Sequence, residues 1–159
     1  MASRGQILIN EIRRKLNMLS IESIEMANGS HTTMAHVGKD NKWLLDRIKD
    51  EHKSKASTFD TEELLLEAIR DYFNDDYAAR RVADFILDPS KNCGRYVDAG
   101  AIYDEETDEF KVLGRVAYKN GSIFNATNYS LVLACKGIDY RNKFTGLPFD
   151  IITVTCEEE

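Results

Sequence analysis

Four side chains that can transfer protons or bind anions lie close together in the first third of the sequence. They are His31, His36, Lys39 and Arg47. An imidazole transfers protons near neutral pH because its ordinary pKa is about 6.5. A guanidinium presents a planar fork of donors that fits phosphate oxygens, and an ammonium adds a point charge. This combination predicts acid–base chemistry at a phosphodiester that needs no metal ion.

The spacing of the two histidines leaves the role of the first one open. Residues five apart lie about 140° apart around an α-helix, so the two imidazoles diverge unless the helix begins after His31. His31 either caps or anchors the loop, or acts as a second proton-transfer group. The spacing also differs from the i, i+4 histidines of a zinc-binding HExxH helix, and Thr32 and Thr33 supply no carboxylate. We expect no metal site and no cofactor.

Apolar residues at helical spacing dominate the first half of the chain. Asp40 and Asp60 are suited to cap two of the helices, and Asp88-Pro89 stops the last one. Ser30 or Thr32 can cap a short helix that carries both histidines and ends at Gly38. The pattern predicts longer helices through residues 5–19, 43–51, 61–73 and 77–87.

The second half alternates apolar and polar residues, as strands do. Residues 110–118 are predicted to form one strand, and Asn120-Gly121 is a strong hairpin turn. Residues 57–59 are expected to form only a brief extended link. Further β-rich runs cover residues 96–97, 101–103, 130–135 and 150–156. Helices followed by strands, without β-α-β alternation, predict an α+β fold with an antiparallel sheet.

Several short runs together resemble a known family. They are His36-Val-Gly-Lys39, Leu44-Leu-Asp-Arg47, Ala56-Ser-Thr-Phe59 and Ile152-Thr153-Val154. In order and spacing they are similar, over roughly residues 25–156, to the RNase A-like toxin domain at the C-termini of bacterial contact-dependent growth inhibition proteins. The resemblance implies helices followed by a split antiparallel β-sheet, RNase A-like, without disulfides. We expect residues 1–24 to form an N-terminal helix and lead-in, and residues 25–159 the toxin domain, together one compact domain.

The resemblance also implies which residues act. The family's catalytic histidine falls on His36, its arginine on Arg47 and a C-terminal threonine on Thr153. The family usually has tyrosine and then proline two residues further on, where this chain has Thr155 and Cys156. Thr155 keeps a hydroxyl for substrate binding but cannot stack on a base. The implied activity is that of a metal-free ribonuclease, with RNA as substrate, a cognate immunity protein as partner, and delivery from a secreted bacterial toxin into the cytoplasm of a target cell.

The residues fit that chemistry on physical grounds as well. Metal-free RNA cleavage through a 2′,3′-cyclic phosphate needs a base for the 2′-hydroxyl, an acid for the departing 5′ oxygen and donors around the phosphorane. We assign His36 to proton transfer, Arg47 to transition-state charge and Lys39 to a helping role at the phosphate. His31 is the candidate second acid–base group, and Thr153 would hold the phosphate or orient the imidazole. The same histidine would also suit an enzyme acting on mononucleotides or other phosphate esters.

Net charge is the main observation against a nucleic-acid enzyme. The chain carries a net charge of −6, whereas proteins that bind nucleic acids usually have a basic surface. The charge is uneven: residues 36–55 contain six Lys or Arg and four Asp or Glu, whereas residues 60–76 contain seven acidic residues and one arginine. A second hypothesis is therefore a non-catalytic binding module or immunity-type protein that engages a partner through this acidic helix. The ordinary alternative for the helix is a solvated face.

Other features limit the class of protein. No run of roughly 18 apolar residues predicts a membrane helix, and the N-terminus lacks the pattern of a secretory signal. Cys93, Cys135 and Cys156 are expected to be buried or incidental thiols, with a single disulfide as the minority alternative. Arg47 and Lys39 also fit an ordinary alternative, as solvated charges.

Overall fold

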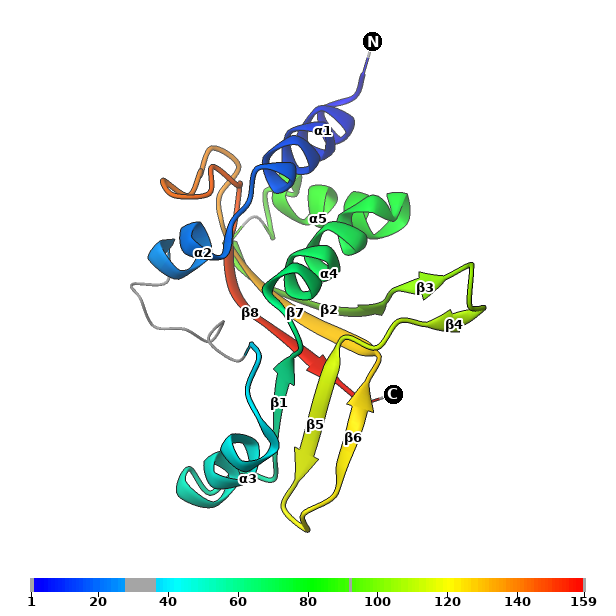
Figure 1. Cartoon of the computed structure of the whole chain (residues 1–159). Helices are drawn as coiled ribbons and strands as arrows, with labels where there is room; N and C mark the ends of the chain where they lie inside the picture. The colour runs from blue at the N-terminus through cyan, green and yellow to red at the C-terminus, as the bar shows by residue number, and fades with distance from the viewer. Residues whose placement is uncertain (1, 28–36, 92, 159) are drawn as a thin grey trace.

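Helices and small antiparallel sheets make up the chain, which a computed structural model describes over residues 2–27, 37–91 and 93–158 (Figure 1). The helices are α1 (Arg4–Asn17), α2 (Ile21–Ala27), α3 (Asn41–Asp50), α4 (Glu62–Asn74) and α5 (Asp76–Leu87). The strands are β1 (Lys55–Phe59), β2 (Cys93–Ala101), β3 (Tyr103–Asp104), β4 (Glu109–Phe110), β5 (Gly114–Tyr118), β6 (Ile123–Ala126), β7 (Asn128–Lys136) and β8 (Asp150–Glu157). The predicted α+β class, with N-terminal helices and antiparallel sheets, is confirmed.

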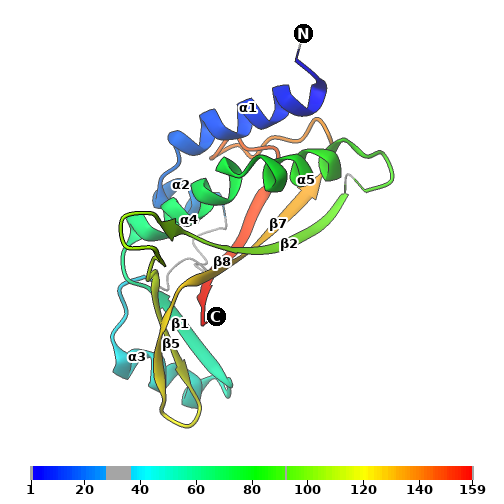
Figure 2. The same ribbon diagram turned by 90° about the vertical axis from the view of Figure 1, so that its right-hand side faces the viewer.

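The larger sheet, in the order β2-β7-β8, is covered on one face by α1, α4 and α5 (Figure 2). On α1 the buried side chains Leu8, Ile12 and Leu16 recur at helical spacing. They join alternate residues of β7, such as Leu131 and Leu133, in the main hydrophobic core. Burial of each such side chain stabilises the fold by roughly 1.5–3 kcal/mol. Within the described ranges, none of the helices has both the length and the apolar character needed to cross a bilayer.

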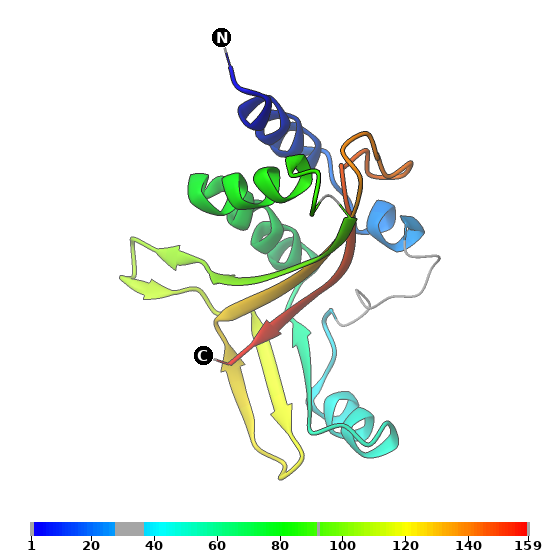
Figure 3. The ribbon, with the colours of Figure 1, turned by 180° about the vertical axis from the view of Figure 1, so that it is seen from behind.

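The smaller sheet, in the order β1-β5-β6, packs against α3 (Figure 3). Leu44 and Ile48 of α3 form a separate small core with Ala56 of β1 and Ala117 of β5. Asp40 caps the helix, as predicted, because its carboxylate accepts a hydrogen bond of 2.8 Å from the Trp43 amide. The smaller sheet thereby fixes the position of α3 beside β1.

The two sheets meet where β8 lies beside β1. A single residue, Thr127, separates β6 of the smaller sheet from β7 of the larger one, so the chain passes directly between them. The β8 strand pairs with β7 and continues past the edge of β1, where the Cys156 Sγ lies 3.0 Å from the Thr58 carbonyl oxygen. Two edge strands from different sheets therefore face each other.

Gly114 marks the closest approach of β5 to β1. A Cβ at this position would lie 1.9 Å from the Thr58 carbonyl oxygen and 2.9 Å from the Phe59 Cα. Gly114→Ala is expected to lower the free energy of unfolding by about 3 kcal/mol, because backbone atoms cannot move aside cheaply. Urea denaturation measures the change. Gly5→Ala in α1 is the matched control, since the closest atom to its Cβ would be the flexible end of Arg80 at 3.1 Å. Equal stability of the two variants would contradict the expectation.

The structure corrects the predicted start of α4. Thr61 caps this helix, not Asp60, because the Thr61 hydroxyl accepts a hydrogen bond of 3.1 Å from the Leu64 amide. Asp60 instead lies 3.7 Å from the Arg115 guanidinium. Both residue types cap helices well, so the sequence alone did not separate them.

Two strand predictions were also wrong in detail. Residues 57–59 belong to β1, a full partner of β5, and are not a brief link. The single strand predicted over residues 110–118 is divided into β4 and β5. The break arises because Lys111 donates its amide proton to the Ile102 carbonyl, whereas Leu113 donates to the Ala126 carbonyl. The hairpin turn at Asn120-Gly121 is confirmed, with β5 pairing β6 across it.

Candidate active site

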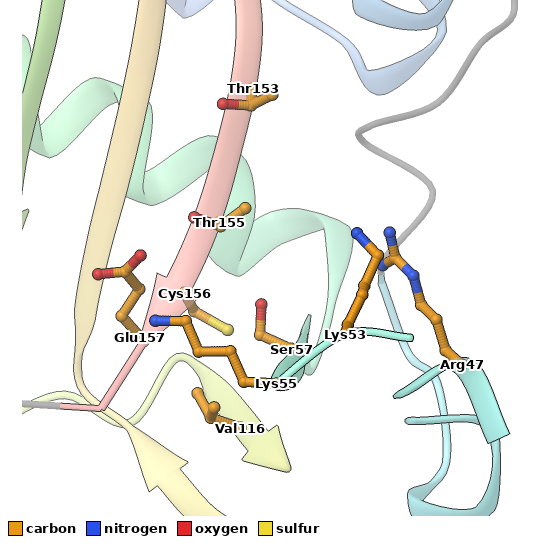
Figure 4. A pocket seen from close by; sticks show the side chains of 9 residues that line it. All are labelled: Arg47, Lys53, Lys55, Ser57, Val116, Thr153, Thr155, Cys156 and Glu157. Carbon is orange, nitrogen blue, oxygen red and sulfur yellow. The ribbon is translucent and has the colours of Figure 1, made fainter. Parts of the chain in front are cut away.

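A cavity of about 280 Å³ lies at the junction of the two sheets (Figure 4). Its walls come from α3, from β1 and the turn before it, from β5 and from the C-terminal half of β8. The lining residues are Arg47, Lys53, Lys55, Ser57, Val116, Thr153, Thr155, Cys156 and Glu157. Three cationic side chains and three hydroxyl groups therefore surround one concave site.

Strand periodicity places Lys55 and Ser57 in this cavity. Alternate residues of a strand point to the same face, and Ala56 between them is buried on the other face. Lys53 precedes the strand at the same spacing and also lines the cavity. In Figure 4 the Lys55 side chain reaches from β1 toward β8.

A β-bulge in β8 brings its threonines to the same site. Val132 of β7 opposes Thr153, whereas Leu133 opposes Ile151, so the register shifts by one residue between them. The shift allows Ile151 to stay in the core while Thr153 and Thr155 line the cavity. The extra residue thus re-aims the end of the strand toward the cavity.

The Arg47 side chain is held on several sides. Its Nε donates a hydrogen bond of 2.7 Å to the Glu51 carboxylate, one turn further along α3. Its guanidinium carbon lies 5.5 Å from the centre of the Trp43 ring, and only 18% of the side chain is exposed. A cation over an indole face is stabilised by the ring quadrupole. The guanidinium is therefore positioned before any ligand arrives.

The charge balance of the cavity favours an anion. Lys53 and Lys55 make no ion pair with another described residue, and Glu157 is the carboxylate among the lining residues. These cations gather in a chain whose net charge is −6. Cations without a carboxylate partner repel one another and destabilise the fold. Their convergence therefore indicates a site for a negatively charged ligand.

The Cys156 thiol at the floor of the cavity is not a nucleophile. Burial raises its pKa to about 12, so it stays protonated near neutral pH. Its sulfur instead contacts the Thr58 carbonyl and holds β8 against β1. Cys135 is likewise buried and Cys93 is exposed, and all three cysteines are free, as the sequence predicted.

Three of the six predicted site residues meet in the cavity: Arg47, Thr153 and Thr155. Lys39 lies elsewhere, with its ammonium 5.2 Å from the centre of the Trp43 ring, in a shallow depression next to α3. Lys39 and Arg47 thus contact the same indole.

The predicted catalytic residues His31 and His36, and the short helix expected to carry them, lie outside the described residues. The chain that follows is anchored to β1. Val37 pairs with Phe59 in a parallel bridge, and the Gly38 amide donates to the Phe59 carbonyl at 2.7 Å. Gly38 has a φ of +68°, which a glycine adopts easily. The segment next to His36 in sequence is therefore attached to the strand that lines the cavity.

The sequence analysis missed Lys53, Lys55, Ser57 and Glu157 as candidate site residues. The i, i+2 spacing of the first three was visible, but it carries meaning only once Lys55 and Ser57 are known to lie in a strand that Lys53 precedes. Among the described residues, no group of three or more His, Cys, Asp or Glu side chains is arranged to hold a metal ion.

A comparison with solved structures finds a chain that shares this fold. No protein-family model matches the chain, and no curated protein matches it. The structure is similar to one chain of the crystal structure of a CdiA-CT/CdiI complex from Y. kristensenii 33638, with a TM-score of 0.61 and 17% sequence identity. The match covers 80% of this chain and 98% of that chain. The two chains therefore share a fold.

Proposed function

We propose that this protein is a toxin ribonuclease that cleaves RNA phosphodiester bonds without a metal ion. The observation that carries the proposal is the cavity in which Arg47, Lys53 and Lys55 face the hydroxyls of Thr153 and Thr155 in an otherwise acidic chain. A phosphodiester is the ligand that this set of donors fits, since guanidinium, ammonium and hydroxyl groups all donate to phosphate oxygens.

The proposed reaction proceeds through a 2′,3′-cyclic phosphate. His36 takes part in proton transfer, with His31 as the candidate second acid–base group, so that the 2′ oxygen attacks phosphorus and the 5′ oxygen leaves protonated. Arg47 stabilises the charge on the pentacoordinate phosphorane. Thr153 holds the phosphate or orients the imidazole. Lys39, which contacts the same Trp43 ring as Arg47, adds positive charge close to the site.

The biological setting is part of the same proposal. The short runs around His36 and Arg47 resemble toxin domains of contact-dependent growth inhibition, and the structural neighbour is a chain of a CdiA-CT/CdiI complex. Both support a toxin that a cognate immunity protein neutralises and that is delivered from a secreted bacterial protein into the cytoplasm of a target cell. Residues 25–159 would form the RNase A-like toxin domain, with residues 1–24 as its helical lead-in.

The alternative, a binding module that engages a partner through residues 60–76, gains little support from the structure. Most carboxylates of this stretch are used within the chain, which leaves chiefly Glu62 and Glu63 for a partner. The internal contacts join Asp60 to Arg115, Glu67 to Lys111, Asp71 to Tyr129 and Asp76 to Arg13, and Asp75 caps α5.

The purified chain is expected to degrade single-stranded RNA in the presence of EDTA. The products should carry 2′,3′-cyclic phosphate ends, because the 2′ oxygen is the nucleophile. The control is the same oligonucleotide with one 2′-deoxy residue, which should resist cleavage at that linkage only. Mass spectrometry of the products identifies the ends. Cleavage that requires a divalent metal, or that proceeds equally well at the deoxy position, would contradict the mechanism, and hydrolysis of mononucleotides alone would favour a phosphate-ester enzyme.

A further inference from the structure

A second cavity, of about 530 Å³, lies beside the first, and none of its lining residues was predicted to act. It is formed by the C-terminal part of α3, the turn that follows, and the end of β5. Its lining residues are Leu45, Ile48, Lys49, His52, Lys53, Tyr118 and Lys119. Lys53 lines both cavities, so the two are neighbours. The volume is within the roughly 300–1,000 Å³ of small-molecule binding pockets.

The second cavity combines positive charge with an apolar wall. Lys49 and Lys119 make no ion pair with another described residue, and no carboxylate is among the lining residues. A hydrogen bond to the Glu158 carboxylate raises the pKa of Tyr118. The side chains of Leu45 and Ile48 supply the apolar wall. A ligand that is flat and apolar on one side and anionic on the other matches this lining.

Tyr118 supplies an aromatic ring to the lining of the second cavity, and Phe124 contacts this ring without being a lining residue. The Tyr118 ring packs edge to face against Phe124, with ring centroids 5.9 Å apart, and Phe124 is 48% exposed. Aromatic rings beside cations are the usual platform for single-stranded nucleic acids, because each base presents a π-face whatever its identity.

The turn that ends α3 carries His52 to the second cavity. In this turn the Glu51 amide donates to the Arg47 carbonyl and the Lys53 amide donates to the Ile48 carbonyl, each at 3.0 Å. The residue between them, His52, has a φ of +53°, a position that favours glycine. This left-handed conformation closes the turn and satisfies the last carbonyls of α3, and the His52 side chain lines the second cavity.

We propose that the second cavity binds a nucleotide of single-stranded RNA next to the one whose phosphate lies in the first cavity. The base packs between Tyr118, His52 and the apolar wall, and Lys49 and Lys119 contact its phosphate. Lys53 spans the two cavities and contacts the linkage between the nucleotides. This inference rests on the proposed ribonuclease function and adds to it that the substrate is a polymer of more than two nucleotides.

The test compares kcat/KM for a dinucleotide and for a hexanucleotide of the same composition. The ratio of kcat/KM for the hexanucleotide to kcat/KM for the dinucleotide is expected to fall at least fivefold in His52→Gly and in Lys119→Gln. A fivefold loss is the lower end of the effect when one base-stacking contact is removed. Glycine suits the backbone at position 52, so this variant should fold with an unchanged or higher melting temperature. The matched control is Lys91→Gln, an exposed lysine between α5 and β2, which should leave the ratio unchanged. An unchanged ratio in both test variants overturns the proposal.

A binding measurement separates this proposal from the proposed function. Uncleavable 2′-O-methyl RNA hexanucleotide, labelled with fluorescein, is titrated with each variant at several salt concentrations. Loss of Lys49 and Lys119 together should reduce the slope of log K against log salt by about 1.4, since each phosphate contact on a single strand contributes about 0.7. If RNA is cleaved but neither the salt slope nor the kcat/KM ratio changes in the variants, the proposed second site is wrong and the proposed ribonuclease function stands. If RNA is not cleaved but the slope falls, the site stands and the function is wrong.

Discussion

His36→Ala is expected to lower the rate of RNA cleavage by about 10²–10⁴-fold, the usual contribution of a positioned acid–base group. The loss should appear in kcat, because the imidazole acts on protons that move only in the transition state. Initial rates on a fluorogenic oligonucleotide in EDTA measure the effect, and circular dichroism checks that the fold is retained. A variant that cleaves at the rate of the wild type would remove His36 from the mechanism.

The pH profile gives the same prediction a second readout. The wild-type rate should change with pH as an imidazole gains or loses its proton, and this limb should vanish in His36→Ala. A rate that rises with pH along this limb identifies His36 as the base, and one that falls identifies it as the acid. His31→Ala separates the two interpretations of the other histidine. A loss of similar size assigns His31 to proton transfer, whereas an intact rate with a lower melting temperature assigns it to a cap.

The convergence of distant residues could be predicted only through a family resemblance. Arg47 and Thr153 lie more than a hundred positions apart in the sequence, yet both line one cavity. Periodicity alone predicted the helix of one and the strand of the other. It gave no information about which strand edge would face which helix, because that depends on how β8 crosses from the larger sheet to β1.

Local signals predicted where these helices begin to within one residue but could not choose between neighbouring cap residues. Asp40 was identified correctly, although Asn41 beside it is an equally good cap residue. Asp60 was chosen wrongly because Thr61 beside it caps equally well. Asp60 instead approaches Arg115, a tertiary contact that no local pattern contains.

Strand β1 illustrates why part of the site was missed. Its five residues are short for a strand signal, and its partner β5 lies over fifty residues away in sequence. Without that pairing, Lys53, Lys55 and Ser57 read as ordinary polar residues between two helices. The pairing places Lys55 and Ser57 on one face of β1, and Lys53 precedes them at the same spacing. Two of the three cations of the cavity therefore come from this segment. The missing information was therefore the pairing of two strands that are far apart in the sequence, which residue types alone do not specify.

Arg47→Ala is expected to lower kcat by about 10²–10³-fold, the range seen when one donor to a developing oxyanion is removed. The Arg47 side chain is already positioned by Glu51 and by the Trp43 ring, so ordering it during the reaction costs little free energy in the wild type. KM should change much less than kcat, because the charge on the phosphorane exceeds that on the ground-state phosphate. Steady-state kinetics on the same oligonucleotide separates the two parameters.

The stability of the fold should survive this change. The Arg47–Glu51 ion pair spans one helical turn and half of the Glu51 side chain is exposed, so its loss costs under about 1 kcal/mol. Arg80→Ala, which removes an exposed arginine of α5, is the matched control and should retain wild-type kinetics. Arg47→Lys should recover only part of the rate, because an ammonium keeps the charge but lacks the planar fork. A rise in KM with kcat unchanged would assign Arg47 to substrate binding alone, and full activity in Arg47→Ala would mean that the cavity is not where RNA is cut.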